Sequence, residues 1–138
     1  MDGIVIIQDR VIVYANDRAA AMVGATPGGL LGMPFAQYIH PDAAHELTRQ
    51  YQRRLAGEAM PASFELTLQF RDGHQLPVEI SAGVIHYRGQ PADMLIIRDV
   101  SARKRAEDEI RSKTEALEQL NRALHEERRK LLGGGDNQ

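Results

Sequence analysis

Residues 64–80 read FELTLQFRDGHQLPVEI, and this stretch determines which fold the rest of the chain must complete. From Phe64 to Phe70 every second residue is apolar and the residues between them are polar, which is the two-residue period of a half-buried strand. The turn Arg71-Asp72-Gly73-His74 contains the Asp-Gly pair typical of hairpins and leads into a second run from Leu76 to Tyr87. We therefore expect a long antiparallel β-hairpin here.

A second hairpin is predicted at the N-terminal end of the chain. Ile4 to Gln8 and Val11 to Tyr14 are β-branched runs separated only by Asp9-Arg10. Asn16 then precedes a short helical run from Asp17 to Val23, which its side-chain oxygen can cap. Two strands and a capped helix therefore open the domain.

A longer helix is predicted between the two hairpins, beginning after Pro41 and ending before Gly57. Helical spacing places four of its residues on one face, which we expect to pack inward: Ala44, Leu47, Tyr51 and Leu55.

The last strand is predicted over Met94 to Arg98, which is apolar at both alternating positions, as expected of a strand covered on each side. The whole pattern predicts an α+β domain with five strands and three or four short helices.

Composition excludes several classes of protein. The 138 residues suffice for one core plus an extension, and no apolar run approaches the ~20 residues that span a bilayer. The chain has no cysteine, which excludes disulfides and a cysteine nucleophile. A net charge of −2 with interleaved basic and acidic residues argues against nucleic-acid binding. We expect a cytoplasmic protein without membrane insertion.

The order of these elements resembles the PAS family of sensory domains over about residues 3–100. The resemblance lies in the first helix cap Val13-Tyr14-Ala15-Asn16, the helix entry Ile39-His40-Pro41-Asp42, the turn Arg71-Asp72-Gly73 and the exit motif Arg98-Asp99-Val100-Ser101-Ala102-Arg103-Lys104. It implies a PAS fold, in which a five-stranded antiparallel sheet carries short helices on one face and is followed by a long C-terminal helix. Residues 1–100 would form the PAS sensory domain, 101–132 an amphipathic signalling helix, and 133–138 a disordered tail or the end of an excised fragment.

The exit motif has a physical interpretation. Asp99 ends the last strand, Ser101 can cap the outgoing helix, and Arg103 is close enough in sequence for Asp99 to pair with it. Such a joint would fix the angle between sheet and helix, so we assign signal relay to these three residues. The plainer alternative is an ordinary helix start with an exposed ion pair contributing about 0–1 kcal/mol.

PAS domains often keep a cavity between sheet and helices. The resemblance implies a lining made of Met33, Phe35, Tyr38, Leu47, Tyr51, Leu66, Leu68, Val78, Ile80, Met94 and Ile96. The same residues would also make a filled core, so both a ligand-binding sensor and a purely structural module remain open.

No cofactor is predicted for this cavity. His45 would have to be the axial ligand of a haem, but the inward face of its helix centres near Leu47 and Tyr51, so a haem sensor is the lesser alternative. A cysteinyl-flavin adduct is excluded because the chain has no cysteine.

The outgoing helix carries a heptad pattern. Apolar residues recur every seven positions, with two more at the complementary position, and we call this set the heptad seam: Ala106, Ile110, Leu117, Leu120, Leu124 and Leu131. Lys113 and Glu127 interrupt it. We expect a parallel homodimer, the alternative being a solitary helix folded back on its own domain.

Catalysis is not expected. His45-Glu46 and His125-Glu126 begin zinc-protease patterns, but Arg49 and Arg129 replace the second histidine. His125 partly resembles the phosphoacceptor of sensor histidine kinases, although no ATP-binding domain follows it. The sequence thus predicts a sensory module that binds a small ligand or partner and relays a conformational change to an output domain such as a histidine kinase.

Overall fold

The computed structural model describes residues 2–136, with side chains up to residue 132. The chain divides between Ser101 and Ala102 into two compact units, and each is described by itself.

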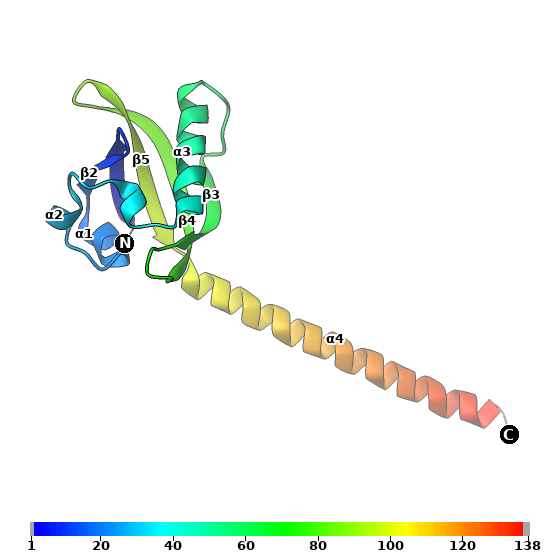
Figure 1. The fold of residues 1–138 in the computed structure, drawn as a ribbon. Helices are drawn as coiled ribbons and strands as arrows, with labels where there is room; N and C mark the ends of the chain where they lie inside the picture. Colours follow the sequence, from blue (N-terminus) through cyan, green and yellow to red (C-terminus); the bar gives the residue numbers. More distant parts are fainter. Residues whose placement is uncertain (1, 137–138) are drawn as a thin grey trace. The chain divides into compact units, whose positions relative to one another are not determined.

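The first unit is built on one antiparallel sheet with the strand order β2-β1-β5-β4-β3 (Figure 1). The outer strands come from different hairpins, and β5 lies between them. The strands are β1 (Gly3–Gln8), β2 (Val11–Ala15), β3 (Ser63–Gln69), β4 (Gln75–Tyr87) and β5 (Gln90–Asp99).

Short helices connect β2 to β3 and pack on the sheet, α1 against β1, α2 against β2 and α3 against β4. Their side chains and the inner face of the sheet form one apolar core. The helices are α1 (Asp17–Met22), α2 (Pro27–Leu30), the 3₁₀ helix η1 (Phe35–Gln37) and α3 (Pro41–Leu55). The α+β fold and its antiparallel five-stranded sheet are as predicted from the sequence.

Asn16 caps α1, as predicted, and it also joins the helix to the first hairpin. Its side-chain oxygen accepts hydrogen bonds from the backbone N–H groups of Ala19 and Ile4, each at 2.9 Å. One residue thereby caps α1 and ties it to β1. The approach is close, because a Cβ on Gly3 would lie 3.2 Å from the Cα of Ala19. A larger residue at this position would require Ala19 to move by a few tenths of an ångström.

Helix α3 begins at Pro41, one residue before the predicted start, and is capped by His40, whose Nδ1 accepts from the backbone N–H of Asp42 at 3.1 Å. Ala44 and Leu47 are buried on its inner face. The prediction for Leu55 was wrong, since that side chain is 48% exposed. Leu55 lines an open cavity at the last turn of the helix, which leaves about half of its side chain exposed.

The second unit is helical. Helix α4 (Ser101–Asp136) continues through residues 133–136, which we expected to belong to a tail, whereas 137–138 lie outside the described residues. Intrahelical ion pairs such as Arg103 with Glu107 and Arg111 with Asp108 support its exposed surface. Within the described part of the chain, no helix combines the length and apolar character that crossing a bilayer requires.

Candidate functional site

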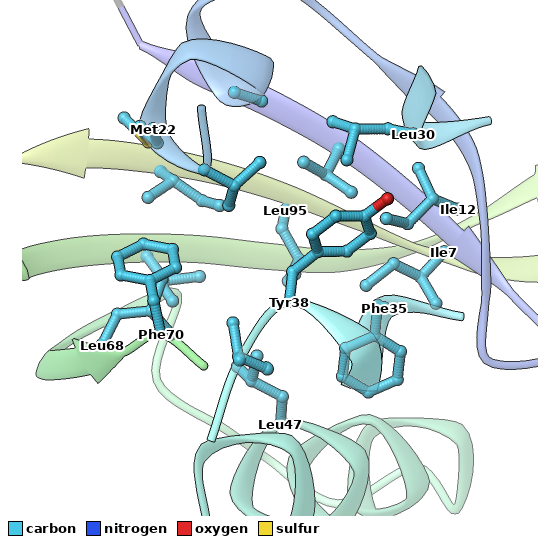
Figure 2. Close-up of a pocket in the computed structure, with 16 residues that line it drawn as sticks. Ile7, Ile12, Met22, Leu30, Phe35, Tyr38, Leu47, Leu68, Phe70 and Leu95 are labelled. Carbon is cyan, nitrogen blue, oxygen red and sulfur yellow. The ribbon is translucent and has the colours of Figure 1, made fainter. Parts of the chain in front are cut away.

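An apolar cavity of about 70 Å³ lies inside the first unit, between the inner face of the sheet and the helices (Figure 2). Every strand and helix from β1 to β5 contributes at least one side chain to a wall that is aliphatic and aromatic. The lining consists of Val5, Ile7, Ile12, Ala19, Met22, Val23, Leu30, Phe35, Tyr38, Ile39, Leu47, Leu68, Phe70, Ile80, Leu95 and Ile97.

Tyr38 carries the one polar side-chain group of this lining. Figure 2 shows its ring among the aliphatic side chains, with the hydroxyl oxygen at the end of the ring nearest Leu30 and Ile12 in that view. A cavity with such walls holds water poorly, because a buried water needs two to four polar partners. Its volume leaves room for a molecule of only a few heavy atoms.

Five of the residues predicted to line a cavity do so. Phe35, Tyr38 and Leu47 come from the helical segment, and Leu68 and Ile80 from β3 and β4. On these two strands the polar residues at alternate positions identify the inner face from the sequence.

Met94 and Ile96 were assigned to the wrong face of β5. The pairs Ile80 with Ile97 and Val5 with Leu95 place the odd-numbered residues of β5 on the inner face. Met94 and Ile96 therefore lie on the outer face, where they are half-buried. Because β5 is apolar at both alternating positions, its own sequence carries no signal for the correct choice.

The remaining four predicted residues lie near the cavity or away from it. Val78 is fully buried and Leu66 packs against the core, but neither lines the cavity. Met33 is half-buried in the connection to η1 and does not line it either. Tyr51 lines a second cavity, which also borders α3.

Asp99 joins two elements at the end of β5. Its Oδ1 accepts the backbone N–H of Ser101 at 2.8 Å and also the Ser101 hydroxyl, so the carboxylate holds the first residue of α4. Its Oδ2 lies 3.6 Å from Nη2 of Arg18 on α1. Ser101 is thus the first helical residue, held by Asp99, and not the preceding cap that we expected.

Arg18 was not predicted from the sequence to have a functional contact. It is next to Ala19, which lines the apolar cavity, and so connects the cavity wall to Asp99. A basic residue in a short helix carries no signal for such a contact, because its partner is 81 positions away in the chain.

The heptad seam is exposed along α4. Exposed fractions are 66% for Ile110, 61% for Leu117, 55% for Leu120 and Leu124, and 75% for Leu131. Ala106 is exposed as well. Apolar side chains repeated every seven residues on an exposed helix are the pattern of a partner-facing stripe.

Two histidines that were considered as functional residues from the sequence, His45 and His125, lie on exposed surfaces. His45 is exposed on α3 and does not line the apolar cavity, and His125 is exposed on α4. Within residues 2–136, no three His, Cys, Asp or Glu side chains cluster in a way that could hold a metal ion.

Comparison with known families supports the interpretation of the fold. A family model described as the PAS fold matches residues 1–100. Sporulation kinase A of Bacillus subtilis (strain 168) is 24% identical over 110 residues, which is 79% of this chain but only 18% of the kinase. The chain thus spans less than a fifth of the length of that curated relative.

Solved structures show the same fold. A PAS domain from Desulfitobacterium hafniense, 23% identical, covers 71% of this chain and 92% of its own with a TM-score of 0.58. A PAS domain of a LuxR-family transcriptional regulator from Burkholderia thailandensis, solved in complex with ethanol, is 18% identical, covers 72% of this chain and 89% of its own, and has a TM-score of 0.56.

Proposed function

This chain belongs to the PAS family, whose members include the sensory domains of signalling proteins such as histidine kinases, and from that premise we propose that it couples its apolar cavity to the pairing of α4 with a second copy of the chain. In this proposal, occupancy of the cavity changes the position of α1. The change reaches α4 through Asp99 and is passed to an output domain in a longer protein.

The observation that carries this proposal is the double contact of Asp99. Arg18 holds the carboxylate from α1, whose Ala19 and Met22 line the cavity, and Ser101 holds it from α4. The pair with Arg18 is long and half-exposed, so it contributes little to stability and can re-form in a different geometry at small cost. We assign a relay role to Asp99 and Ser101, and Arg103 stays with them as the third predicted relay residue.

The size of the cavity restricts the ligand. With about 70 Å³ and one hydroxyl, it suits an apolar or weakly polar molecule of two to four heavy atoms. The ethanol bound by the Burkholderia relative supports this size class. The same small volume favours the second candidate, a structural module whose core needs no ligand.

The heptad seam supports the second half of the proposal. The five large apolar side chains of the heptad seam are more than half exposed, and a parallel two-stranded coiled coil would cover them. Lys113 and Glu127 within the seam weaken the packing and leave its register adjustable, as a relay requires.

Pairing is tested on the intact chain by light scattering. We expect twice the chain mass for the wild type and for Ser112→Asp, which adds a charge outside the seam, but a monomer for Leu117→Asp. A wild-type monomer, or equal masses for both variants, contradicts the pairing.

Relay is tested with a spin label. Because the chain has no cysteine, Ser112→Cys gives one label per copy, and electron–electron double resonance measures the distance between the two helices. We expect ethanol to change this distance in the otherwise unchanged chain and in Asp2→Asn, but not in Asp99→Asn or in Val23→Phe, which fills the cavity. A distance unaffected by ethanol, with no ethanol-induced shifts in the spectra of the lining residues, supports the structural module instead.

A further inference from the structure

A second cavity, which we call the polar cavity, lies between α3, the turn joining β1 to β2, and the start of β5. Its volume is about 330 Å³. It is separated from the apolar cavity by side chains that line both, namely Ile7, Phe35 and Leu47. Most of its remaining lining is polar, with Leu55 and Pro91 as the apolar exceptions, and this distinguishes it from the apolar cavity.

Asp93 is the buried charge in this wall. It is 5% exposed, and its Oδ1 accepts from Nη1 of Arg54 at 3.2 Å. An ionised carboxylate has about four positions for accepting hydrogen bonds, and within the described residues this is the one bond that Asp93 accepts. Arg54 does not line the polar cavity, and among the described residues none of the side chains that line it donates a hydrogen bond to Asp93.

The electrostatics show how poorly this carboxylate is solvated. Burial raises the pKa of Asp93 to about 6, and the attraction of Arg54 only partly offsets it. The pKa of Tyr51, on the same cavity wall, is raised by burial and then by the negative charges of Asp93 and Asp9. The fields of both carboxylates therefore reach the Tyr51 hydroxyl.

We propose that the polar cavity binds a small organic ammonium ion, whose N–H groups donate to the carboxylate of Asp93 and the hydroxyl of Tyr51. The ion supplies the donors that the buried carboxylate lacks, and its alkyl part lies against Ile7, Phe35 and Leu47. Asp9 and Arg10 lie side by side in the cavity lining and are both exposed, so solvent screens both charges and Asp93 remains the buried charge that faces the ion.

The polar cavity is separate from the one discussed above, and ammonium binding does not depend on α4 or on pairing. A volume of 330 Å³ lies within the range of ordinary ligand cavities and suits an amine of five or more heavy atoms. Binding is therefore measurable on the protein even where the relay fails.

The test uses three probes of one shape: butylammonium, 1-butanol and butyrate. Amide nitrogen–proton correlation spectra of the intact chain are recorded during titration at pH 7.5. We expect saturable shifts at Asp93, Tyr51 and Gln90 with butylammonium, and at least tenfold weaker binding of butanol and butyrate. Equal binding of butanol would overturn the proposal in favour of an apolar subsite, and no saturable shift with any probe would show a cavity filled by water.

Variants identify the group that binds. Asp93→Asn should weaken butylammonium binding at least tenfold, and the double variant Arg54→Gln with Asp93→Asn, which leaves no buried charge, should do the same if the single variant folds poorly. Tyr51→Phe should weaken it about three- to tenfold, as expected for one hydrogen bond. The control is Asp42→Asn, which removes an exposed carboxylate on α3, the helix that carries Tyr51. Unchanged affinity in Asp93→Asn and in the double variant contradicts the assignment.

Binding should also depend on pH with a defined sign. Protonation of Asp93 removes the charge that holds the ion, so affinity should fall as the pH drops below 6. The charged or titratable groups near Asp93 are Arg54 and Tyr51 on α3 and Asp9 and Arg10 in the turn, while its strand partners Ile7 and Val84 do not titrate. An affinity independent of pH from 5 to 7.5 argues against Asp93 as the ligand.

Discussion

The apolar cavity and the polar cavity share Ile7, Phe35 and Leu47, but the rest of their linings differ in polarity. The apolar cavity is small and carries one hydroxyl, whereas the polar cavity is larger and contains a buried carboxylate paired with Arg54. The comparison shows that a single layer of side chains can separate an apolar environment from a charged one within a small domain. An apolar cavity is stabilised by close packing, and a polar one requires each buried charge to find a partner.

The largest effect is expected from enlarging the apolar cavity. Ile80 is fully buried in its wall, so Ile80→Ala should lower the free energy of unfolding by about 2–5 kcal/mol. Val84→Ala, on the same strand but 38% exposed, should cost less than about 1 kcal/mol. Urea denaturation measures both, and equal losses would contradict the packed apolar wall.

Breaking the ion pair between Arg54 and Asp93 should give the next largest loss of stability. Arg54→Met leaves Asp93 buried without its partner, which should cost about 2–4 kcal/mol at pH 8. The loss should shrink at pH 5, where the carboxyl takes up a proton and no charge remains to be paired. Restoration of stability in the double variant Arg54→Met with Asp93→Leu would show that the loss arises from the unpaired charge.

The titration of Asp93 should make stability change with pH in the direction opposite to that of a carboxylate with a lowered pKa. Its pKa in the folded protein, about 6, is above the ordinary 3.8, so the folded state binds the proton more tightly than the unfolded state does. Its contribution to stability is therefore present below pH 4 and is lost as the pH rises through 6, by roughly 3 kcal/mol.

Two other carboxylates, Asp2 and Glu46, act in the opposite direction because hydrogen bonds lower their pKa values. The donors are Arg98 for Asp2, and Gln50 and Arg49 for Glu46. The measurement is therefore the difference in unfolding free energy between wild type and Asp93→Asn from pH 4 to 7.5. Wild type should lose stability relative to the variant as the pH rises. Parallel curves would place Asp93 in a solvated environment.

The smallest effect concerns the turn that borders the polar cavity. Asp9 and Arg10 both have positive φ values, 53° and 67°, which residues other than glycine rarely adopt. Arg10→Gly should raise the free energy of unfolding by about 0.5–1 kcal/mol, whereas Arg10→Ala, which keeps the Cβ, should not. Thermal unfolding of the two variants measures the difference, and equal midpoints would show that the turn is unstrained.

The sequence by itself determined the elements and their order. Alternation on β3 and β4, the Asp-Gly turn and the Asn16 cap are local signals, so they predict local structure and the inner faces of those strands. The exposed heptad seam is also a local periodicity, and its pairing remains a proposal.

Tertiary structure alone decided what depends on contacts between distant segments. The inner face of β5 is set by its neighbours β1 and β4, because its own residues are apolar on both sides. The contacts of Asp93 with Arg54 and of Asp99 with Arg18 join residues 39 and 81 positions apart, so no spacing in the sequence predicts them. Burial and charge pairing are properties of the packed chain, and for that reason the polar cavity became visible only in the fold.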